Sequence, residues 1–196
     1  MEQKITNNAN KGFTIVEVLI SLTIFSIAVA GVITVAVQGS LNVNAARNKV
    51  TASYLADEGV ELMRSMRDTA VVNAGVGFEA AGWTAFNSPA FASLCITASC
   101  DIDPTNNAGS DPYPSASNIS DCTPTAGFCH LYYVPSTGYY TGVVTTPGLT
   151  PSIFSRGIRL TVLNPDEIQI TSTVQWTEGT VVQSVTQTET LFNWYI

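Results

Sequence analysis

Charged residues are scarce in this chain of 196 residues: Asp, Glu, Lys and Arg together make up 12% of it, about half the fraction usual in soluble globular proteins. Basic residues are rarer still in the second part, where only Arg156 and Arg159 lie beyond Val71, against nine acids between Glu79 and Glu189. Such an acidic surface repels phosphate groups. We therefore expect no nucleic-acid binding by this part of the chain.

Proline is absent from the first 88 residues, and all nine prolines lie at Pro89 or beyond. Because proline breaks helices, the asymmetry divides the chain into a front part that can be helical and a rear part of loops and strands. There is no internal repeat. No glycine-rich phosphate loop or paired-carboxylate signature is present either, so nothing in the sequence argues for an enzyme.

The four cysteines, Cys95, Cys100, Cys122 and Cys129, all lie in one stretch rich in Pro, Gly and Asn. Low charge with abundant Thr, Ser and Asn is typical of secreted or cell-surface proteins, where an even number of cysteines indicates disulfides. Three pairings are possible, and we favour the local one, Cys95 with Cys100 and Cys122 with Cys129. The alternative is a zinc site, but no spacing is C-x-x-C, and His130 directly follows Cys129.

A long apolar run spans Phe13–Val37, with Glu17 as its only charged residue. The run is long enough to cross a bilayer, which takes roughly 20 apolar residues. Lys4 and Lys11 precede it in the polar segment Met1–Gly12 and should stay on the cytoplasmic side. We therefore expect one transmembrane segment at 13–37, with the remainder of the chain outside the cytoplasm.

Helical periodicity continues past the apolar run, in residues 38–70. Apolar and small residues recur there at a 3-4-3-4 spacing that places them on one helix face: Ala52, Leu55, Gly59, Leu62 and Met66. Arg64 is spaced to pair with Glu61 and with Asp68 on the exposed side. A helix from Phe13 to about Asp68 would be about 80 Å long.

The rear part, 71–196, begins with a loop-rich region at 71–150, which we expect to be irregular up to about Cys129, and continues with antiparallel strands at 153–194. Strand signals occur at His130–Val134, at Tyr139–Val144, in the alternating residues Ile158–Val162 and Ile168–Trp176, and at Thr180–Phe192. Pro135–Gly138, Asn164–Asp166 and Glu178–Gly179 separate them as turns. The pattern predicts an α+β fold in which the amphipathic half of the long helix covers an antiparallel meander.

The membrane entry reads Lys11-Gly12-Phe13-Thr14-Ile15-Val16-Glu17. A carboxylate at the bilayer centre costs about 2.5–3.5 kcal/mol, and less near the interface, so glutamate is normally avoided in a membrane span. The segment resembles the start of the type IV pilin and type II secretion pseudopilin superfamily, [K/R]-G-F-T-x-x-E before an apolar helix. Over residues 11–67, and more weakly over 153–194, the chain looks most like minor pilins of the V type and I-type pseudopilins; 71–150 shows no resemblance.

The resemblance implies that a prepilin peptidase cuts between Gly12 and Phe13 and methylates the new Phe13 amine. It also implies that Glu17 pairs with the Phe13 amine of a neighbouring subunit. The chain would then be a structural filament subunit, stored in the lipid bilayer of the inner membrane. Pilus or secretion machinery would assemble it with other pilin subunits into a cell-surface or periplasmic filament that serves adhesion, motility, DNA uptake or protein export.

Two other interpretations of the N-terminal part remain open. Ala28-Val29-Ala30 fits the rule for a signal-peptidase site, so residues 1–30 would be a secretory signal of an extracytoplasmic binding protein. The run would otherwise be a plain, uncut membrane anchor. Neither accounts for Gly12, Phe13 and Glu17 together.

Three further hypotheses concern the rear part. The loop around Asp101, Asp103 and Asp111 collects oxygen ligands of the kind that calcium takes, although Asp, Asn and Gly also form simple solvated turns, and no other cofactor is expected. His130 beside Cys129 imitates a catalytic Cys–His pair, but an oxidised cysteine would exclude it and leave a histidine at a strand start. Six aromatic residues would form either an adhesive surface or parts of the core: Tyr132, Tyr133, Tyr139, Tyr140, Trp83 and Phe86.

Overall fold

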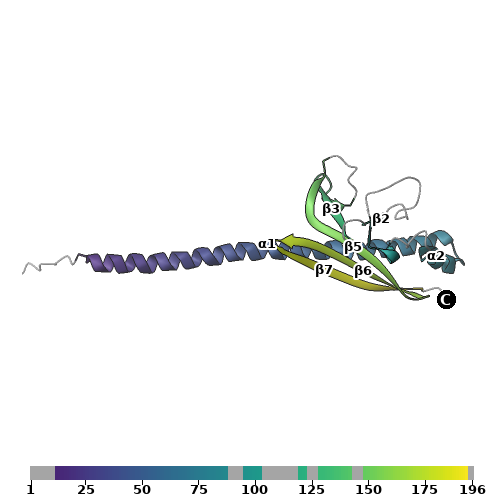
Figure 1. Cartoon of the computed structure of the whole chain (residues 1–196), viewed down its shortest axis with the longest axis horizontal. Helices are drawn as coiled ribbons and strands as arrows, with labels where there is room; N and C mark the ends of the chain where they lie inside the picture. The colour runs from purple at the N-terminus through teal and green to yellow at the C-terminus, as the bar shows by residue number, and fades with distance from the viewer. Residues whose placement is uncertain (1–11, 88–94, 103–118, 123–127, 143–147, 194–196) are drawn as a thin grey trace, which may run out of the picture. The chain divides into compact units, whose positions relative to one another are not determined.

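The computed structural model describes residues 12–87, 95–102, 119–122, 128–142 and 148–193 (Figure 1). By its internal contacts the chain divides into two units, Met1–Ala46 and Arg47–Ile196. The long helix α1, Ile15–Ala74, contributes to both units. Each unit is described below by itself.

In the first unit, α1 is long and apolar enough to cross a membrane. Every described side chain from Gly12 to Asn44 is exposed, including the large apolar residues between Ile15 and Val43. A helix that is apolar on all sides suits a lipid environment, since no face is reserved for water.

In the second unit, α1 buries one face against the sheet. The buried residues are Ala52, Leu55, Ala56, Gly59, Val60, Met63, Met66, Arg67 and Val71. This face contains the predicted stripe, except that Leu62 is only partly buried. The helix ends at Ala74 rather than near Asp68, because the next residue that favours a stop is Gly75, which adopts a left-handed φ of 87°.

A second helix, α2, covers Glu79–Phe86, in a region that the sequence predicted to be irregular. It packs closely on α1 at Gly82, where an added Cβ would lie 2.4 Å from the Cα of Val71. Trp83 and Phe86 are buried at 4% and 0% exposure, so they belong to the core. The hypothesis that they join an exposed aromatic surface is wrong.

The strands are β1 (Cys100–Ile102), β2 (Ile119–Asp121), β3 (Cys129–Val134), β4 (Tyr139–Thr141), β5 (Thr150–Asn164), β6 (Glu167–Glu178) and β7 (Val181–Phe192). They form one seven-stranded antiparallel sheet in the order β2-β1-β5-β3-β4, with β6 pairing to β5 and β7 to β6. The predicted α+β fold, with an antiparallel meander covered by the long helix, is confirmed.

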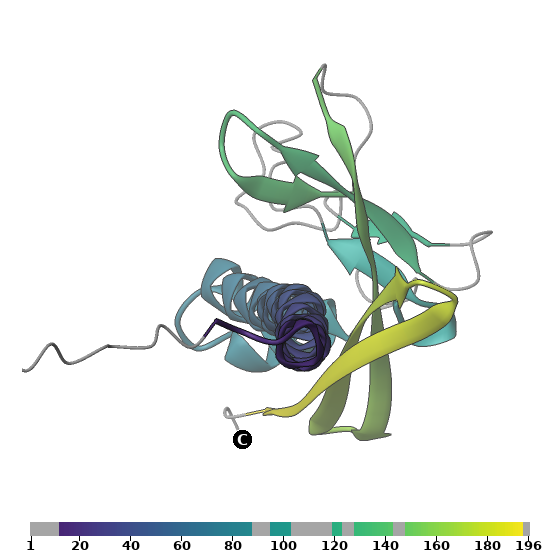
Figure 2. The ribbon, with the colours of Figure 1, turned by 90° about the vertical axis from the view of Figure 1, so that its left-hand side faces the viewer.

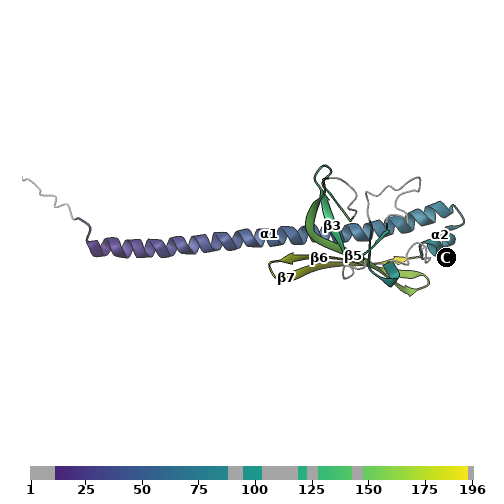
Figure 3. The same ribbon diagram turned by 45° about the horizontal axis from the view of Figure 1, so that its top comes forward.

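The sheet and the two helices enclose the core. In β6 every second residue from Ile168 to Trp176 is buried, as expected for a strand with one wet face. The larger cluster joins Met63 and Met66 of α1, and Trp83 of α2, to the sheet residues Ile158 and Ile170. Figures 2 and 3 show the strands β5, β6 and β7 beside the second half of α1.

Both disulfides have the local pairing that the sequence favoured: Cys95–Cys100 and Cys122–Cys129. No described cysteine is free, which removes the thiolates that a zinc site or a nucleophilic cysteine would need. The two bonds stabilise the stretch that supplies β1, β2 and the start of β3, where each strand alone is too short to be stable.

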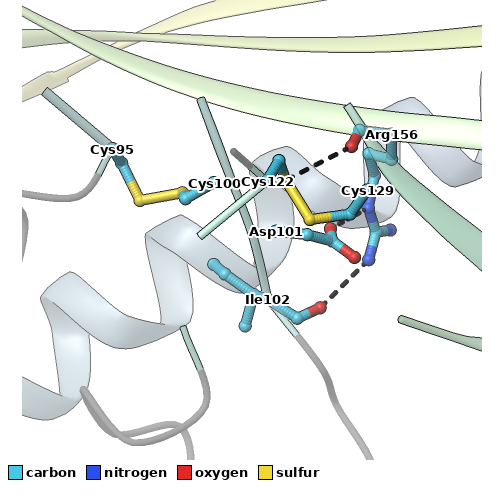
Figure 4. The surroundings of a disulfide bond; sticks show 7 residues. All are labelled: Cys95, Cys100, Asp101, Ile102, Cys122, Cys129 and Arg156. Carbon is cyan, nitrogen blue, oxygen red and sulfur yellow. Dashed lines mark hydrogen bonds and ion pairs between the residues drawn. A yellow bond between two sulfur atoms is a disulfide. The ribbon is translucent and has the colours of Figure 1, made fainter. Parts of the chain in front are cut away.

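A buried arginine lies beside the Cys122–Cys129 disulfide (Figure 4). Arg156 of β5 is 1% exposed. Its Nε donates to Asp101 Oδ1 (2.6 Å), and its terminal nitrogens donate to Glu58 Oε2 (2.9 Å) and to the main-chain carbonyls of Leu55 (3.1 Å) and Ile102 (3.0 Å). Arg156 therefore joins α1, β1 and β5 through one planar group.

Two electrostatic effects act on this arginine. Burial opposes the charge, but Asp101 and Glu58 outweigh this effect and raise the pKa of Arg156 above its ordinary value.

Arg64, in contrast, pairs at the surface with Glu61 and Glu189. The predicted partner Asp68 instead pairs with Arg67, whose Nε lies 2.5 Å from its carboxylate.

We expect Arg156→Met to lower the free energy of unfolding by about 3–5 kcal/mol, because it leaves the buried Asp101 carboxylate without its cation. Arg159→Met, on the exposed side of the same strand, should change it by less than about 0.5 kcal/mol. Chemical denaturation of the full chain in detergent micelles measures both. Equal effects of the two variants would contradict the role of Arg156; the double variant Arg156→Met with Asp101→Leu should recover part of the loss.

Candidate functional site

The described chain begins with Gly12, Phe13 and Thr14, all exposed and without regular secondary structure. Thr14 caps α1: its side-chain Oγ1 accepts the N–H of Glu17 (3.2 Å), and its carbonyl accepts the N–H of Val18 (3.2 Å). Thr14-x-x-Glu17 has the spacing of a capping box. The cap explains why the helix begins at Ile15 and not at Gly12.

Hydroxyl groups within the apolar run find their partners on the same helix. Ser21, Ser26 and Thr34 donate to the carbonyls four residues earlier (2.7, 2.7 and 2.9 Å), and Thr23 donates to the carbonyl of Ile20 (2.8 Å). Each of these side chains can therefore enter lipid without an unsatisfied donor.

Glu17 differs from these residues. Its side chain is exposed, and among the residues that the structure describes its carboxylate accepts no hydrogen bond and forms no ion pair. Its place in the first turn is favourable, since a negative charge there opposes the helix dipole. That interaction is worth about 0.3–1 kcal/mol, less than the cost of placing the charge in lipid. The described part of the chain supplies no cation for this carboxylate.

The rest of the predicted leader, with Lys4 and Lys11, lies outside the described residues. The structure therefore places three of the residues singled out from the sequence, Gly12, Phe13 and Glu17, in one exposed segment, with Thr14 between them. The sequence pattern missed only the capping role of Thr14, although the capping-box spacing could have revealed it.

The calcium hypothesis is not supported at Asp101. This residue is 1% exposed, and its carboxylate is used by Arg156 rather than presented to a loop site. The other two candidates, Asp103 and Asp111, lie outside the described residues. Within the described ranges, no three His, Cys, Asp or Glu side chains come together as metal ligands would.

The Cys–His hypothesis is wrong, because Cys129 is bonded to Cys122. His130 is an exposed residue of β3 whose ring lies edge-on to Tyr132, with centroids 5.0 Å apart. Of the six aromatic residues considered above, Tyr139 is the most exposed, at 61%, while Tyr140 packs on the buried Phe154. The tyrosines therefore belong partly to the core.

Comparison with known proteins agrees with the N-terminal segment as the site. The family model described as the prokaryotic N-terminal methylation motif matches residues 7–33. The match includes Gly12, Phe13 and Glu17 and does not extend into the second unit. No curated protein and no solved structure matches the chain.

We expect Thr14→Val, which keeps the shape of the side chain but removes the acceptor, to destabilise the first turn by about 1 kcal/mol. The amide of Glu17 should then exchange with deuterium about fivefold faster in detergent micelles, and Thr14→Ser should restore the slow rate. Thr34→Val removes a hydroxyl in mid-helix and should leave the Glu17 amide unchanged. An unaltered exchange rate in Thr14→Val would show that Thr14 does not act as the cap.

Proposed function

We propose that this chain, whose N-terminal methylation motif is that of the type IV pilin and pseudopilin superfamily, is a structural filament subunit: a minor pilin or a pseudopilin. Prepilin peptidase cleaves it and methylates it, and the assembly machinery adds it to a pilus or secretion pseudopilus. One observation carries the proposal. Glu17 is the single polar side chain of the apolar run that has no partner among the described residues.

Cleavage between Gly12 and Phe13 agrees with the local geometry. A protease binds its substrate as extended backbone, and a peptide bond inside a helix would have to be unwound first. Gly12 and Phe13 precede the Thr14 cap and are exposed. Glycine before the cut also leaves space at the enzyme, since it carries no side chain.

Cleavage would create the cation that Glu17 lacks. The amine of Phe13 becomes a free, positively charged group at the start of α1. The positive end of the helix dipole lies there and repels it. In lipid, such an amine and the Glu17 carboxylate of a neighbouring subunit would compensate each other. A buried pair of this kind adds little net stability, but it strongly penalises neighbours in the wrong register.

The second unit suits an extracytoplasmic head. Its two disulfides require an oxidising compartment, and the two lysines before the apolar run favour a cytoplasmic N-terminus. The proposal therefore places the chain in the inner membrane as a single-pass protein, and then in a cell-surface or periplasmic filament.

The secretory alternative accounts for fewer observations. A cut after Ala30 would fall inside α1, which continues without interruption from Ile15 to Ala74. It would also discard Glu17 and the matched motif, neither of which a signal peptide requires. The motif points to a structural subunit rather than to an enzyme.

Mass spectrometry of the mature chain, produced together with a prepilin peptidase, should give an N-terminal Phe13 that carries one methyl group. This follows if the peptidase recognises the Gly12–Phe13 bond. A mature chain beginning at Gly31 would identify a secretory protein instead, and one that retains the leader would identify a plain anchor.

We expect Glu17→Ala and Glu17→Gln to insert into the membrane normally but to enter filaments at least about tenfold less often, because the neighbouring amine then remains uncompensated. Ser21→Ala is the matched control, since that hydroxyl is satisfied within the helix by the Glu17 carbonyl. Immunoblots of sheared filaments and of membrane fractions measure both quantities. Normal incorporation of Glu17→Gln would refute the pairing.

A further inference from the structure

The sheet of the second unit opens into a fork. Ser155 of β5 pairs with Gln175 of β6, and this is the last pair between the two strands. Beyond it, β5 continues toward Thr150 paired with β3, and β6 continues to Glu178 paired with β7. Figures 1 and 2 show the β3–β4 and β6–β7 pairs leaving β5 on different sides.

Both strands of the fork have an edge with no strand partner. Within the described part of the chain, Thr150 and Pro151 of β5 pair only with β3, residues 152–154 have no strand partner, and residues 176–178 of β6 pair only with β7. No pair across the fork joins these two segments, and the N–H of Phe154 donates to the hydroxyl of Ser152 in place of a strand. Such edges attract a further strand unless they are blocked.

The fork is closed on its inner side and hollow on its outer side. Phe154 and Trp176, both 4% exposed, meet on the core side with ring centroids 6.1 Å apart. On the outer side a groove of about 400 Å³ is lined by residues that include His130, Ile153, Thr177 and Val182. This volume lies in the range of small-ligand pockets.

The described residues that line the groove are polar or apolar, and His130 is the only one of them with a titratable side chain. Ser155, Gln175 and Thr177 contribute hydroxyl and amide groups, and Ile153 and Val182 are apolar side chains exposed at 51% and 63%. Among the described residues that line it there is no carboxylate, lysine or arginine, although the chain carries a net charge of −7. A charged ligand would lose hydration here without gaining a partner of opposite sign.

A bulge reinforces the opening. The register between β3 and β5 shifts between His130 and Tyr132, and Ser152 fills the irregularity by donating to the carbonyl of Leu131 (2.6 Å). Bulges bend a strand and are frequent beside functional sites. Here the bend carries the first part of β5 away from β6.

From these observations we propose that the fork between β5 and β6 binds a short, extended, uncharged peptide strand of a partner protein. The peptide would pair its main chain with the free edges at Ile153 and Thr177 and place apolar side chains against Ile153 and Val182. Main-chain pairing provides the affinity and side-chain pockets the specificity in this mode of recognition. The proposal concerns the second unit alone and does not depend on filament assembly.

The test uses the full chain in detergent micelles and an array of capped octapeptides built from Val, Ile, Thr, Ser and Gln. Peptides that bind should lose at least about tenfold in affinity for Ile153→Glu or Val182→Glu, because either change places a carboxylate in the groove. Val181→Glu is the matched control: Val181 is 55% exposed, adjacent in sequence, and outside the groove lining. It should alter the affinity less than twofold.

A second comparison uses the same peptides with N-methyl groups on alternate amides, which removes main-chain donors and keeps the side chains. Binding should be lost. The proposal is overturned if no peptide of the array binds, if Val181→Glu weakens binding as much as Val182→Glu, or if the methylated peptides bind equally well. Binding of neutral oligosaccharides in place of peptides would also overturn it. Thermal melting of each variant, expected to be unchanged at these exposed positions, excludes unfolding as the cause.

Discussion

Arg156 is the group on which the second unit depends. Two segments far apart in the chain accept hydrogen bonds from this one guanidinium of β5: α1 through Leu55 and Glu58, and β1 through Asp101 and Ile102. A group taken so completely out of water is tolerated only when its charge is compensated and its donors are used. The hydrogen bonds to Arg156 also hold β1 in place, since this strand is only three residues long. The Cys95–Cys100 disulfide is attached directly to β1. Removing the arginine would therefore disturb the helix, the short strand and the disulfide-bonded loop at once.

The packing around this group also determines which surfaces remain available. α1 and α2 cover one face of the sheet, so the opposite face and the strand edges are the surfaces of the sheet that remain exposed. On that opposite face the groove lies where β5 diverges from β6. On the core side, the rings of Phe154 and Trp176 lie between the two diverging strands. The core and the groove are thus two consequences of one feature, the change of partner along β5 near Ser155.

Much of this arrangement follows from periodicity in the sequence, and the remainder from contacts that periodicity does not encode. The 3.6-residue stripe of α1 and the alternation in β5–β7 were predictable because each long element carries many repeats of its pattern. α2, β1 and β2 were missed: they are short, and tertiary contacts such as Gly82 on Val71 and the pair Cys100 with Ile158 select them. The burial of Arg156 was readable in part, since it shares the parity of Ile158 and Leu160 whereas Arg159 does not. The hydrogen-bond partners of Arg156 could not be predicted from the sequence, because they come from distant segments of the chain. At the candidate site the sequence identified Gly12, Phe13 and Glu17, and the structure added the Thr14 cap.

The two units treat a buried charge in opposite ways, and the contrast bears on function. In the second unit the charge of Arg156 is compensated within the chain, by Glu58 and Asp101. In the first unit the hydroxyls of the apolar run are satisfied within the helix, yet Glu17 is left without a cation among the described residues. Arg156 is compensated by two carboxylates and two carbonyls of the same chain. A lysine one turn away in α1 would compensate Glu17 in the same way. No such residue is present between Gly12 and Arg47. In the proposed filament, the freed amine of an adjacent subunit would supply this cation.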